Sequence, residues 1–234
     1  MEFIPFIAID VETANTDSAT ICQVGMCFFT SPTESHVSCH LIDPECSFNP
    51  RFRAIHGITP STVRGARTWD SFYSAISFFT DPQLDVIVAS HTYFDREAIR
   101  KACERYSLRP PTPRLWLDTC AIARRTWPDL PNHKLPTLAA HFGISYQAHN
   151  AGEDARCAGQ ILLQAIRDSD KTMIQIMEDH LSAEMGKQVS IKVLDAPSPP
   201  VPDPPPPEKN GIRWAWPVAA ILAVACLLWF AFHS

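Results

Sequence analysis

The chain has 234 residues, of which 46% are hydrophobic, and a formal net charge of −5 at pH 7. This length suits one sizeable domain with an appendage and excludes two full domains. The negative charge argues against a protein that holds nucleic acid through bulk positive charge, because such binding depends on neutralising phosphates with Lys and Arg.

The eight cysteines give no sign of a disulfide framework. No two of them form a CxxC pair, and the first residues run directly into a strand-like segment without a signal peptide. We therefore expect reduced, mostly buried thiols and a body that stays in the cytoplasm.

The N-terminal part of the chain predicts a sheet. Residues 3–11 form a nearly continuous apolar run, which suits a central strand buried on both faces. Residues 21–29 and 37–42 are two further strand candidates, separated by turn-forming residues at 30–34. These three segments predict an antiparallel meander.

Beyond the meander, strands and helices alternate. Apolar residues recur at three-to-four-residue spacing from Trp69 to Phe79, which is typical of a helix packed on a core. The later elements are a strand at 85–89, a helix at 96–106, a strand at 115–117, and helices near 119–127, 137–142 and 153–167. Five strands and their helices predict an α/β domain with a mixed five-stranded sheet.

The composition changes sharply after the body, which we place at residues 1–188. A linker follows at 189–211, and its segment 197–207 contains eight prolines. Such a segment favours extended polyproline II and acts as a semi-rigid spacer, although a ligand for proline-binding modules is the competing interpretation.

The last apolar segment, residues 213–232, has the properties of a membrane span. The nineteen residues from Trp214 to Phe232 carry no charge, and as a helix they would extend about 28 Å. Lys209 and Arg213 flank the near side, so the positive-inside rule keeps the body cytoplasmic. We expect a single-pass C-terminal tail anchor; a buried core helix is disfavoured because the spacer separates this segment from the body.

Four carboxylates stand where strands end or helices begin. Asp10 and Glu12 lie two residues apart in the first strand, so both side chains point to one face and repel each other unless a cation lies between them. Asp95 follows the strand at 85–89, and Asp154 opens the helix at 153–167. Mixed sheets gather functional groups at such positions, so these acids can converge.

Three segments carry these acids in a recognisable order: FIAIDVETA, SHTYFDREAI and HNAGEDARCAGQIL. Two others read IHGITPSTV and LPNHKLPTLAAHFGI. Together they resemble the motifs of the DEDDh family of 3′-to-5′ exonucleases, to which the epsilon proofreading subunit of DNA polymerase III belongs. The resemblance extends over residues 3–167, with every motif in order at ordinary spacing.

The resemblance implies an RNase H-like fold and a two-metal site. Asp10, Glu12, Asp95 and Asp154 would hold two divalent ions, Mg²⁺ or Mn²⁺, and oxygen-only ligands independently favour such hard cations. His149 would be the catalytic general base, because histidine ordinarily titrates near neutral pH and this one precedes Asp154 in the third motif. Two ions would add four positive charges to the formal −5 and leave about −1.

The resemblance also implies a pocket for the terminal nucleotide. Its lining residues would be Thr13, Ala14, Ile55, His56 and Phe94, which grip an unpaired end by apolar and aromatic contact. The chain departs from the family pattern at Thr92, where family members often carry Asn, and around Ala14-Asn15, where they often carry Gly. These departures remove no metal ligand and bear on substrate preference.

The function expected from the sequence is thus a metal-dependent exonuclease that hydrolyses the 3′ ends of DNA, at single-stranded or frayed ends, beside a membrane. Residues 95–134 contain nine Lys or Arg against five acids, which is compatible with a local basic surface for nucleic acid. Ordinary solvated helix faces would have the same composition. One alternative is an RNA exonuclease of the ribonuclease T or oligoribonuclease type. Another is a membrane-tethered nucleic-acid-binding module without catalysis.

Overall fold

Six strands form one mixed sheet in the order β4-β3-β2-β1-β5-β6. The computed structural model describes residues 3–81 and 84–187. The strands are β1 (Phe6–Thr13), β2 (Ile21–Phe29), β3 (Ser35–Asp43), β4 (Arg67–Thr68), β5 (Ile87–Ser90) and β6 (Leu115–Asp118). The central strand β1 pairs antiparallel with β2 and parallel with β5.

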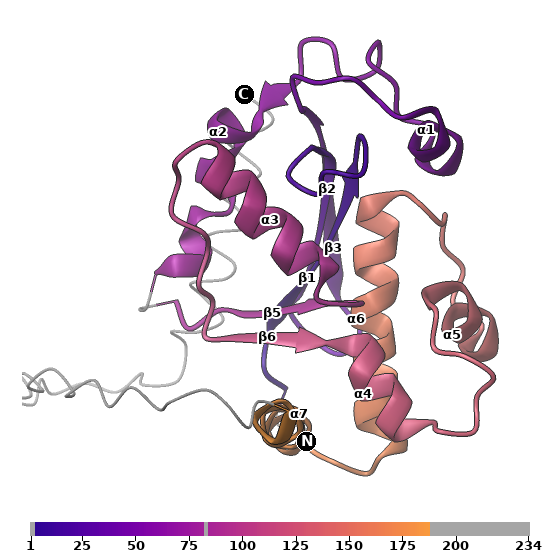
Figure 1. The fold of residues 1–234 in the computed structure, drawn as a ribbon. Coiled ribbons are helices and arrows are strands. Elements are labelled where there is room, and N and C mark those ends of the chain that lie inside the picture. Colours follow the sequence, from indigo (N-terminus) through magenta and orange to yellow (C-terminus); the bar gives the residue numbers. More distant parts are fainter. Residues whose placement is uncertain (1–2, 82–83, 188–234) are drawn as a thin grey trace, which may run out of the picture.

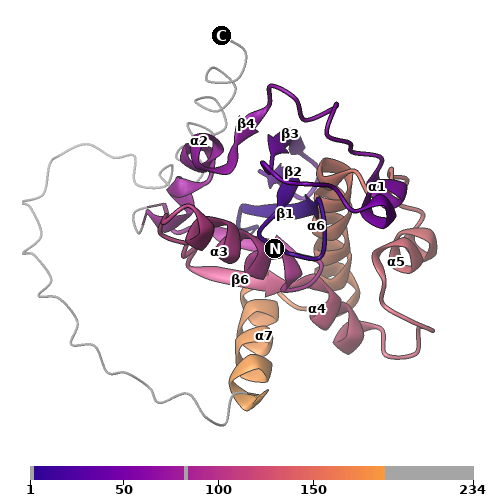
Figure 2. The same cartoon turned by 45° about the horizontal axis from the view of Figure 1, so that its top comes forward.

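The helices cover both faces of this sheet (Figure 1). They are α1 (Pro50–His56), α2 (Trp69–Phe72), α3 (Phe94–Arg105), α4 (Thr119–Thr126), α5 (Leu135–Phe142), α6 (Ala151–Asp168) and α7 (Met173–Lys187). In Figures 1 and 2, α3 and α6 lie on opposite sides of the sheet. The predicted α/β class with a mixed sheet is confirmed.

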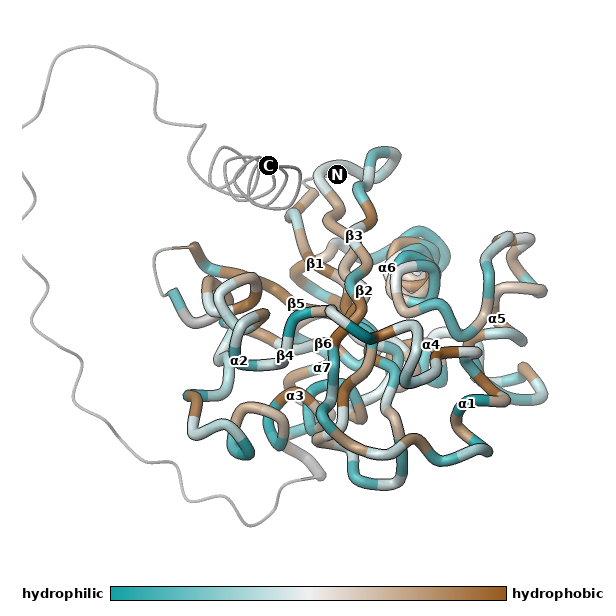
Figure 3. The backbone as a smooth tube through the Cα atoms, turned by 90° about the horizontal axis from the view of Figure 1, so that it is seen from above, coloured by the Kyte–Doolittle hydropathy of each residue, from teal (hydrophilic) through white to brown (hydrophobic). Residues whose placement is uncertain are grey.

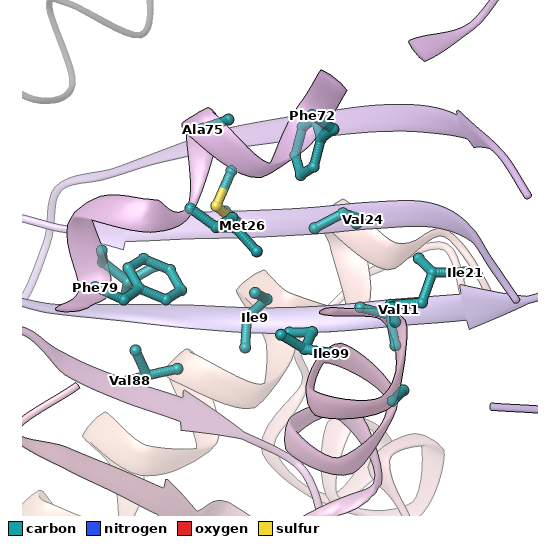
Figure 4. Packing of buried hydrophobic residues seen from close by; sticks show 14 of the residues in the cluster. Ile9, Val11, Ile21, Val24, Met26, Phe72, Ala75, Phe79, Val88 and Ile99 are labelled. Atoms are coloured by element: carbon teal, nitrogen blue, oxygen red, sulfur yellow. The ribbon is translucent and has the colours of Figure 1, made fainter. Parts of the chain in front are cut away.

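Alternation along β1 divides the core into two layers. Ile7, Ile9 and Val11 join one buried cluster with residues of α2 and α3, and Figure 4 shows Ile9 and Val11 near Ile99 of α3. Phe6 and Ala8 point the other way and join a second cluster with α6. Figure 3 shows that brown, apolar segments gather along the central strands. As a result β1 is buried on both faces, as its apolar run predicts.

The predicted count of five strands misses β4. This strand has two residues, and it pairs parallel with the Ile42–Asp43 end of β3. A segment this short has no measurable alternation, so a pattern of apolar residues does not reveal it.

The helix predicted from Trp69 to Phe79 is broken in the structure. It begins as α2 and continues as two 3₁₀ turns, Tyr73–Ala75 and Ser77–Thr80. Its apolar residues are nevertheless buried as predicted, including Trp69, Phe72 and Phe79. Serines and aromatic residues in this segment are weak helix formers, so packing on the sheet determines the path of the backbone.

Two helices were absent from the prediction. Helix α1 buries no residue and so lacks an apolar stripe; Asn49 caps its start, and Gly57 ends it with φ of 74°. Helix α7 does carry a stripe, because Met173, Ile176 and Met177 are buried. These three residues belong to the same buried cluster as Ile122 of α4. Figure 2 shows α7 close to α4 and β6.

The described part of the chain contains seven cysteines, all unpaired and five of them buried, as expected for reduced thiols. No helix within it is both long and apolar enough to cross a bilayer. The linker at 189–211 and the span predicted at 213–232 lie outside the described residues. The boundary at residue 188 therefore stays a prediction.

Candidate active site

Three carboxylates from two elements meet on one face of the sheet, near the end of β1. Asp10 and Glu12 alternate with buried residues on β1, so both side chains leave the strand on the face that α6 covers. Asp154 lies in the first turn of α6. Each of these three side chains places one carboxylate oxygen within 4.8 Å of an oxygen of the other two. Three of the four acids that were expected to converge thus form one group.

The fourth acid, Asp95, lies beside this group and has a different contact. It stands in the first turn of α3 and is 4% exposed. Its Oδ1 accepts a hydrogen bond from the backbone amide of Val11 at 3.1 Å. Because Val11 separates Asp10 from Glu12, Asp95 anchors α3 to the part of β1 that carries the other two carboxylates.

Burial raises the pKa of all four acids, and the charges of neighbouring acids raise it further. Burial, followed by the charges of neighbouring acids, raises the pKa of Asp10 well above its ordinary value. The same causes raise the pKa of Glu12 to about 8. Burial raises the pKa of Asp95 to about 7 and that of Asp154 to about 6, with backbone hydrogen bonds opposing both shifts. A bound divalent cation would relieve this repulsion.

The chemistry of the site fits such a cation. Oδ2 of Asp154 is buried and has no hydrogen-bond partner among the described residues. A buried carboxylate oxygen without a partner is costly, and a metal ion would satisfy it. Carboxylates are the ligands that Mg²⁺ and Mn²⁺ prefer, so Asp10, Glu12 and Asp154 could hold a hard divalent metal.

His149 stands at the rim of the carboxylate group. Its Nδ1 lies 3.8 Å from Oε1 of Glu12, and its side chain is 54% exposed. Its backbone has a φ of 63°, in the left-handed region that non-glycine residues seldom occupy. The next residue, Asn150, caps α6 by accepting from the amide of Glu153 at 3.2 Å. The turn into α6 thus holds an imidazole that reaches both solvent and the carboxylates.

A side chain of β2 holds the turn that leads into α6. Oε1 of Gln23, which pairs with Glu12 across the ladder, accepts a hydrogen bond from the amide of Ala151 at 3.0 Å. Gly25 allows the close approach, because a Cβ there would meet the Ala151 carbonyl carbon at 2.0 Å. Gln23 was not predicted as a site residue, although an uncharged polar residue inside the apolar run of β2 is a usable signal.

The predicted nucleotide pocket has two exposed apolar residues. Ile55 at the end of α1 is 48% exposed, and Phe94 at the start of α3 is 49% exposed. Large apolar side chains of this kind can contact a base. Their role as substrate contacts stays a prediction.

The other predicted pocket residues are engaged within the protein. The ring of His56 donates from Nε2 to the Thr13 carbonyl at 3.2 Å and accepts at Nδ1 from the amide of Ile58. Thr13 is 4% exposed and Ala14 is fully buried. The Ala14 amide donates to Thr20, and its carbonyl accepts from Asn49. Any contact of Thr13 or Ala14 with substrate would therefore require access that their burial does not provide in this structure.

His91 of the second motif is a further residue without a predicted role. Its Nε2 donates to the His133 carbonyl at 2.9 Å, and its Nδ1 contacts the Thr119 hydroxyl at 3.0 Å. Burial lowers the pKa of His91 to about 4, so the ring is neutral. Its function is structural, because it joins the start of α4 to the loop before α5.

Comparison with known proteins identifies the fold and its chemistry. The model of the exonuclease family matches residues 7–162, which is more than half of the chain. The chain belongs to this family. Its domain is therefore an exonuclease domain, the domain of a nuclease that acts as a hydrolase.

Curated relatives of the exonuclease domain are much longer proteins. The chain is 23% identical over 192 residues to DNA polymerase III PolC-type of Caldanaerobacter subterraneus subsp. tengcongensis, covering 81% of this chain and 13% of that protein. It is 27% identical over 180 residues to the PolC-type polymerase of Clostridium perfringens, covering 75% of this chain and 12% of the relative. The chain thus matches a small part of each polymerase.

Solved structures show the same fold. Exonuclease X in complex with 5′ overhanging duplex DNA superposes with a TM-score of 0.58 and 20% identity, over 74% of this chain and 98% of that one. The zinc-bound complex of E. coli ExoI with single-stranded DNA gives a TM-score of 0.64 and 19% identity, over 80% and 46%. A third structure, which shows 3′-end specific recognition of a histone mRNA stem-loop by a 3′-exonuclease, superposes with a TM-score of 0.59 and 15% identity. The match covers 72% of this chain and 84% of that one.

Proposed function

We propose that the domain removes nucleotides from the 3′ end of DNA, at single-stranded or frayed ends, and releases nucleoside monophosphates. The observation that carries this proposal is the set of Asp10, Glu12 and Asp154 with oxygens within 4.8 Å of one another, beside which stand Asp95 and His149. Acids this close, two partly buried and one buried, are stabilised by a cation, and the exposed imidazole offers a proton acceptor next to it.

The four carboxylates would hold two divalent ions, Mg²⁺ or Mn²⁺. When bound, the ions lower the pKa of the attacking water and stabilise the charge that develops on the departing 3′ oxygen. His149 accepts the proton of that water, since its side chain is both exposed and next to Glu12. Asp95 also maintains the position of β1 through the Val11 amide.

DNA as the substrate is supported by the relatives, whose printed descriptions name DNA polymerases and DNA complexes, although one similar structure is named for an mRNA. Ile55 and Phe94 offer exposed apolar surface for stacking on an unpaired terminal base. Stacking of this kind does not depend on sequence, which suits an enzyme that acts at ends.

The test uses the full chain in a non-ionic detergent with 5′-labelled oligonucleotides of one sequence. Single-stranded DNA, blunt duplex DNA and RNA are compared in Mg²⁺. We expect single-stranded DNA to be degraded fastest. Asp10→Ala should lower the rate by more than about a thousandfold, because it removes several kcal/mol of metal-assisted stabilisation. Degradation of RNA alone would replace this proposal with the ribonuclease alternative.

Asp179→Ala is the matched control for Asp10→Ala. Asp179 is an exposed acid on α7 whose partner is Lys171, at 2.6 Å. It lies outside the carboxylate group, so its removal should leave the rate within about twofold of wild type, as exposed ion pairs contribute little to stability.

We further propose that residues 213–232 anchor the enzyme in a membrane, with the exonuclease domain facing the cytoplasm. The support comes from the sequence: the uncharged stretch from 214 to 232, the cations at Lys209 and Arg213, and the proline-rich spacer before them. Membrane fractionation with protease protection tests this. A body that is protected from protease added to the cytoplasmic side would contradict it.

A further inference from the structure

Tyr146 occupies a rigid position in the loop between α5 and α6, three residues before His149. Arg156 of α6 donates to the carbonyl of Ser145 at 2.6 Å, on one side of Tyr146. On the other side the carbonyl of Gln147 accepts from the amide of Asn150 at 3.3 Å. The Tyr146 side chain packs on a buried cluster formed by α5 and α6. Backbone and ring are therefore both held in place.

The Tyr146 hydroxyl is buried and has no hydrogen-bond partner among the described residues. Leaving a buried donor unpaired is unfavourable, and phenylalanine would fill the same apolar cluster without this penalty. The other described tyrosine hydroxyls have protein partners, namely Arg109 for Tyr73, His180 for Tyr93 and Glu45 for Tyr106. Packing alone thus accounts for the ring of Tyr146 and leaves its hydroxyl unexplained.

This hydroxyl lies within electrostatic reach of the carboxylate site. Burial raises its pKa, and the charges that raise it further include Asp154 first and also Asp10. Cys157, which lies one turn after Asp154 on α6, belongs to the cluster that supports the Tyr146 ring. The unpaired Oδ2 of Asp154 is buried as well. Two buried polar atoms without partners, one a donor and one an acceptor, are therefore connected through the same stretch of α6.

We propose that Tyr146 is a positioning residue of the metal site. Its hydroxyl donates a hydrogen bond to a water molecule that donates in turn to Asp154, and this bridge orients that carboxylate toward a divalent cation. This inference rests on the metal site of the proposed function. It adds a residue of the loop between α5 and α6 that orients the metal ligand Asp154. The Val11 amide of β1 orients Asp95 in a similar way.

The test compares wild type with Tyr146→Phe, which removes the hydroxyl and keeps the ring. Mn²⁺ is titrated into the full chain without nucleic acid, and the rise in melting temperature gives a binding midpoint. We expect the midpoint to rise by about 10- to 100-fold, the usual effect of removing a group that orients a metal ligand. The exonuclease rate of the variant should recover toward the wild-type value at high Mn²⁺.

Tyr73→Phe is the matched control. It also removes one hydroxyl, whose partner is the Arg109 carbonyl at 2.7 Å, far in sequence from every carboxylate of the site. We expect its Mn²⁺ midpoint to equal that of wild type. If the Tyr146 hydroxyl affects only packing, Tyr146→Phe should change the melting temperature of the metal-free protein and leave the Mn²⁺ midpoint unchanged.

A Tyr146→Phe midpoint within about twofold of wild type would overturn the inference, as would a wild-type protein that Mn²⁺ does not stabilise. Because the titration contains no substrate, it is separate from the test of the proposed function. A wild-type enzyme that binds Mn²⁺ but degrades no DNA would refute the proposed substrate, and the shifted midpoint of Tyr146→Phe would still support the role of Tyr146.

Discussion

The carboxylate of Asp95 accepts a hydrogen bond from the amide of Val11 at 3.1 Å, across 84 residues of sequence. Val11 is the residue between Asp10 and Glu12, so this bond joins the second acidic motif to the backbone of the first. Asp95 thereby has two separable properties, a charge that a cation can use and an oxygen that satisfies a buried amide.

Substitutions of Asp95 should separate these properties. Asp95→Asn keeps an oxygen for Val11 and removes the charge, so we expect a folded protein with little exonuclease activity. Asp95→Ala also leaves the Val11 amide unpaired, which costs about 1–3 kcal/mol. Its melting temperature should fall below that of Asp95→Asn by about 2–4 °C for each kcal/mol. Calorimetry in EDTA makes the comparison, and equal melting temperatures would show that the bond is unimportant.

Gly25 should be needed for the geometry of the site. A Cβ at this position would lie 2.0 Å from the Ala151 carbonyl carbon and 2.2 Å from the Gly152 nitrogen, both backbone atoms. Gly25→Ala must displace the start of α6, and with it His149 and Asp154. We expect a loss of about 1–3 kcal/mol in stability and about 100-fold in rate, measured on protein that is still folded.

Gly159→Ala provides the comparison for Gly25→Ala. It lies later on α6, where a Cβ would meet the ring of Phe29 at 2.1 Å. The side chain must shift, so stability should also decrease, but the turn that carries His149 is not involved. The folded fraction of Gly159→Ala should keep a rate within about threefold of wild type, since the effect is far from the reacting groups. Equal loss of rate in both variants would contradict this account.

The metal-free protein should lose stability as the pH rises. The pKa of Glu12 is raised to about 8, so folded Glu12 keeps a proton that the unfolded chain releases near its ordinary value of 4.5. The stability is fully present below that ordinary value and is lost as pH rises through about 8. Asp95 and Asp154 act in the same direction, through about 7 and about 6.

Glu12→Gln isolates this effect from other titrating groups. His91 works in the opposite direction: its pKa is lowered to about 4, so its stability contribution is lost as the pH falls through that value. In EDTA at pH 8.5 we expect Glu12→Gln to melt above wild type, with a much smaller difference at pH 5. Added Mn²⁺ should stabilise wild type more than the variant. The reverse order at high pH would contradict the assigned repulsion.

His149 should be needed for the reaction and dispensable for the fold. Its side chain is 54% exposed, so His149→Ala should change stability by less than about 0.5 kcal/mol. The rate should fall by about 10²- to 10⁴-fold, the usual contribution of a general base. His36→Ala, at an exposed histidine of β3, serves as the control and should keep the wild-type rate. A His149→Ala enzyme of normal rate would remove the general base from the mechanism.

The sequence predicted the parts of the site that depend on local geometry. Period-two alternation places Asp10 and Glu12 on one face, and the motif order places Asp95 and Asp154 at helix starts. Burial of the β1 residues follows from the apolar run. These features depend on neighbours within a few residues, which a single sequence displays.

Other parts depend on contacts between distant segments. Whether Gln23 reaches the Ala151 amide is decided by how α6 packs on β2, and the place of the Tyr146 ring is decided by how α5 packs on α6. Helix α1 buries no residue, and its local signals were the caps Asn49 and Gly57 and the proline in its first turn. The family motifs located the chemistry, and the three-dimensional packing was needed to find the residues that support it.

The direction of degradation tests the central claim most directly. The same single-stranded DNA is labelled at its 5′ end in one reaction and at its 3′ end in another, and wild type is compared with Glu12→Gln in Mg²⁺ and in EDTA. The 5′ label should appear in a ladder of progressively shorter strands, and the 3′ label should be released at once as a mononucleotide. Both signals should disappear in EDTA and in the variant. Release of the 5′ label as a mononucleotide, or an unchanged ladder with Glu12→Gln, would contradict a 3′-to-5′ exonuclease that works through these carboxylates.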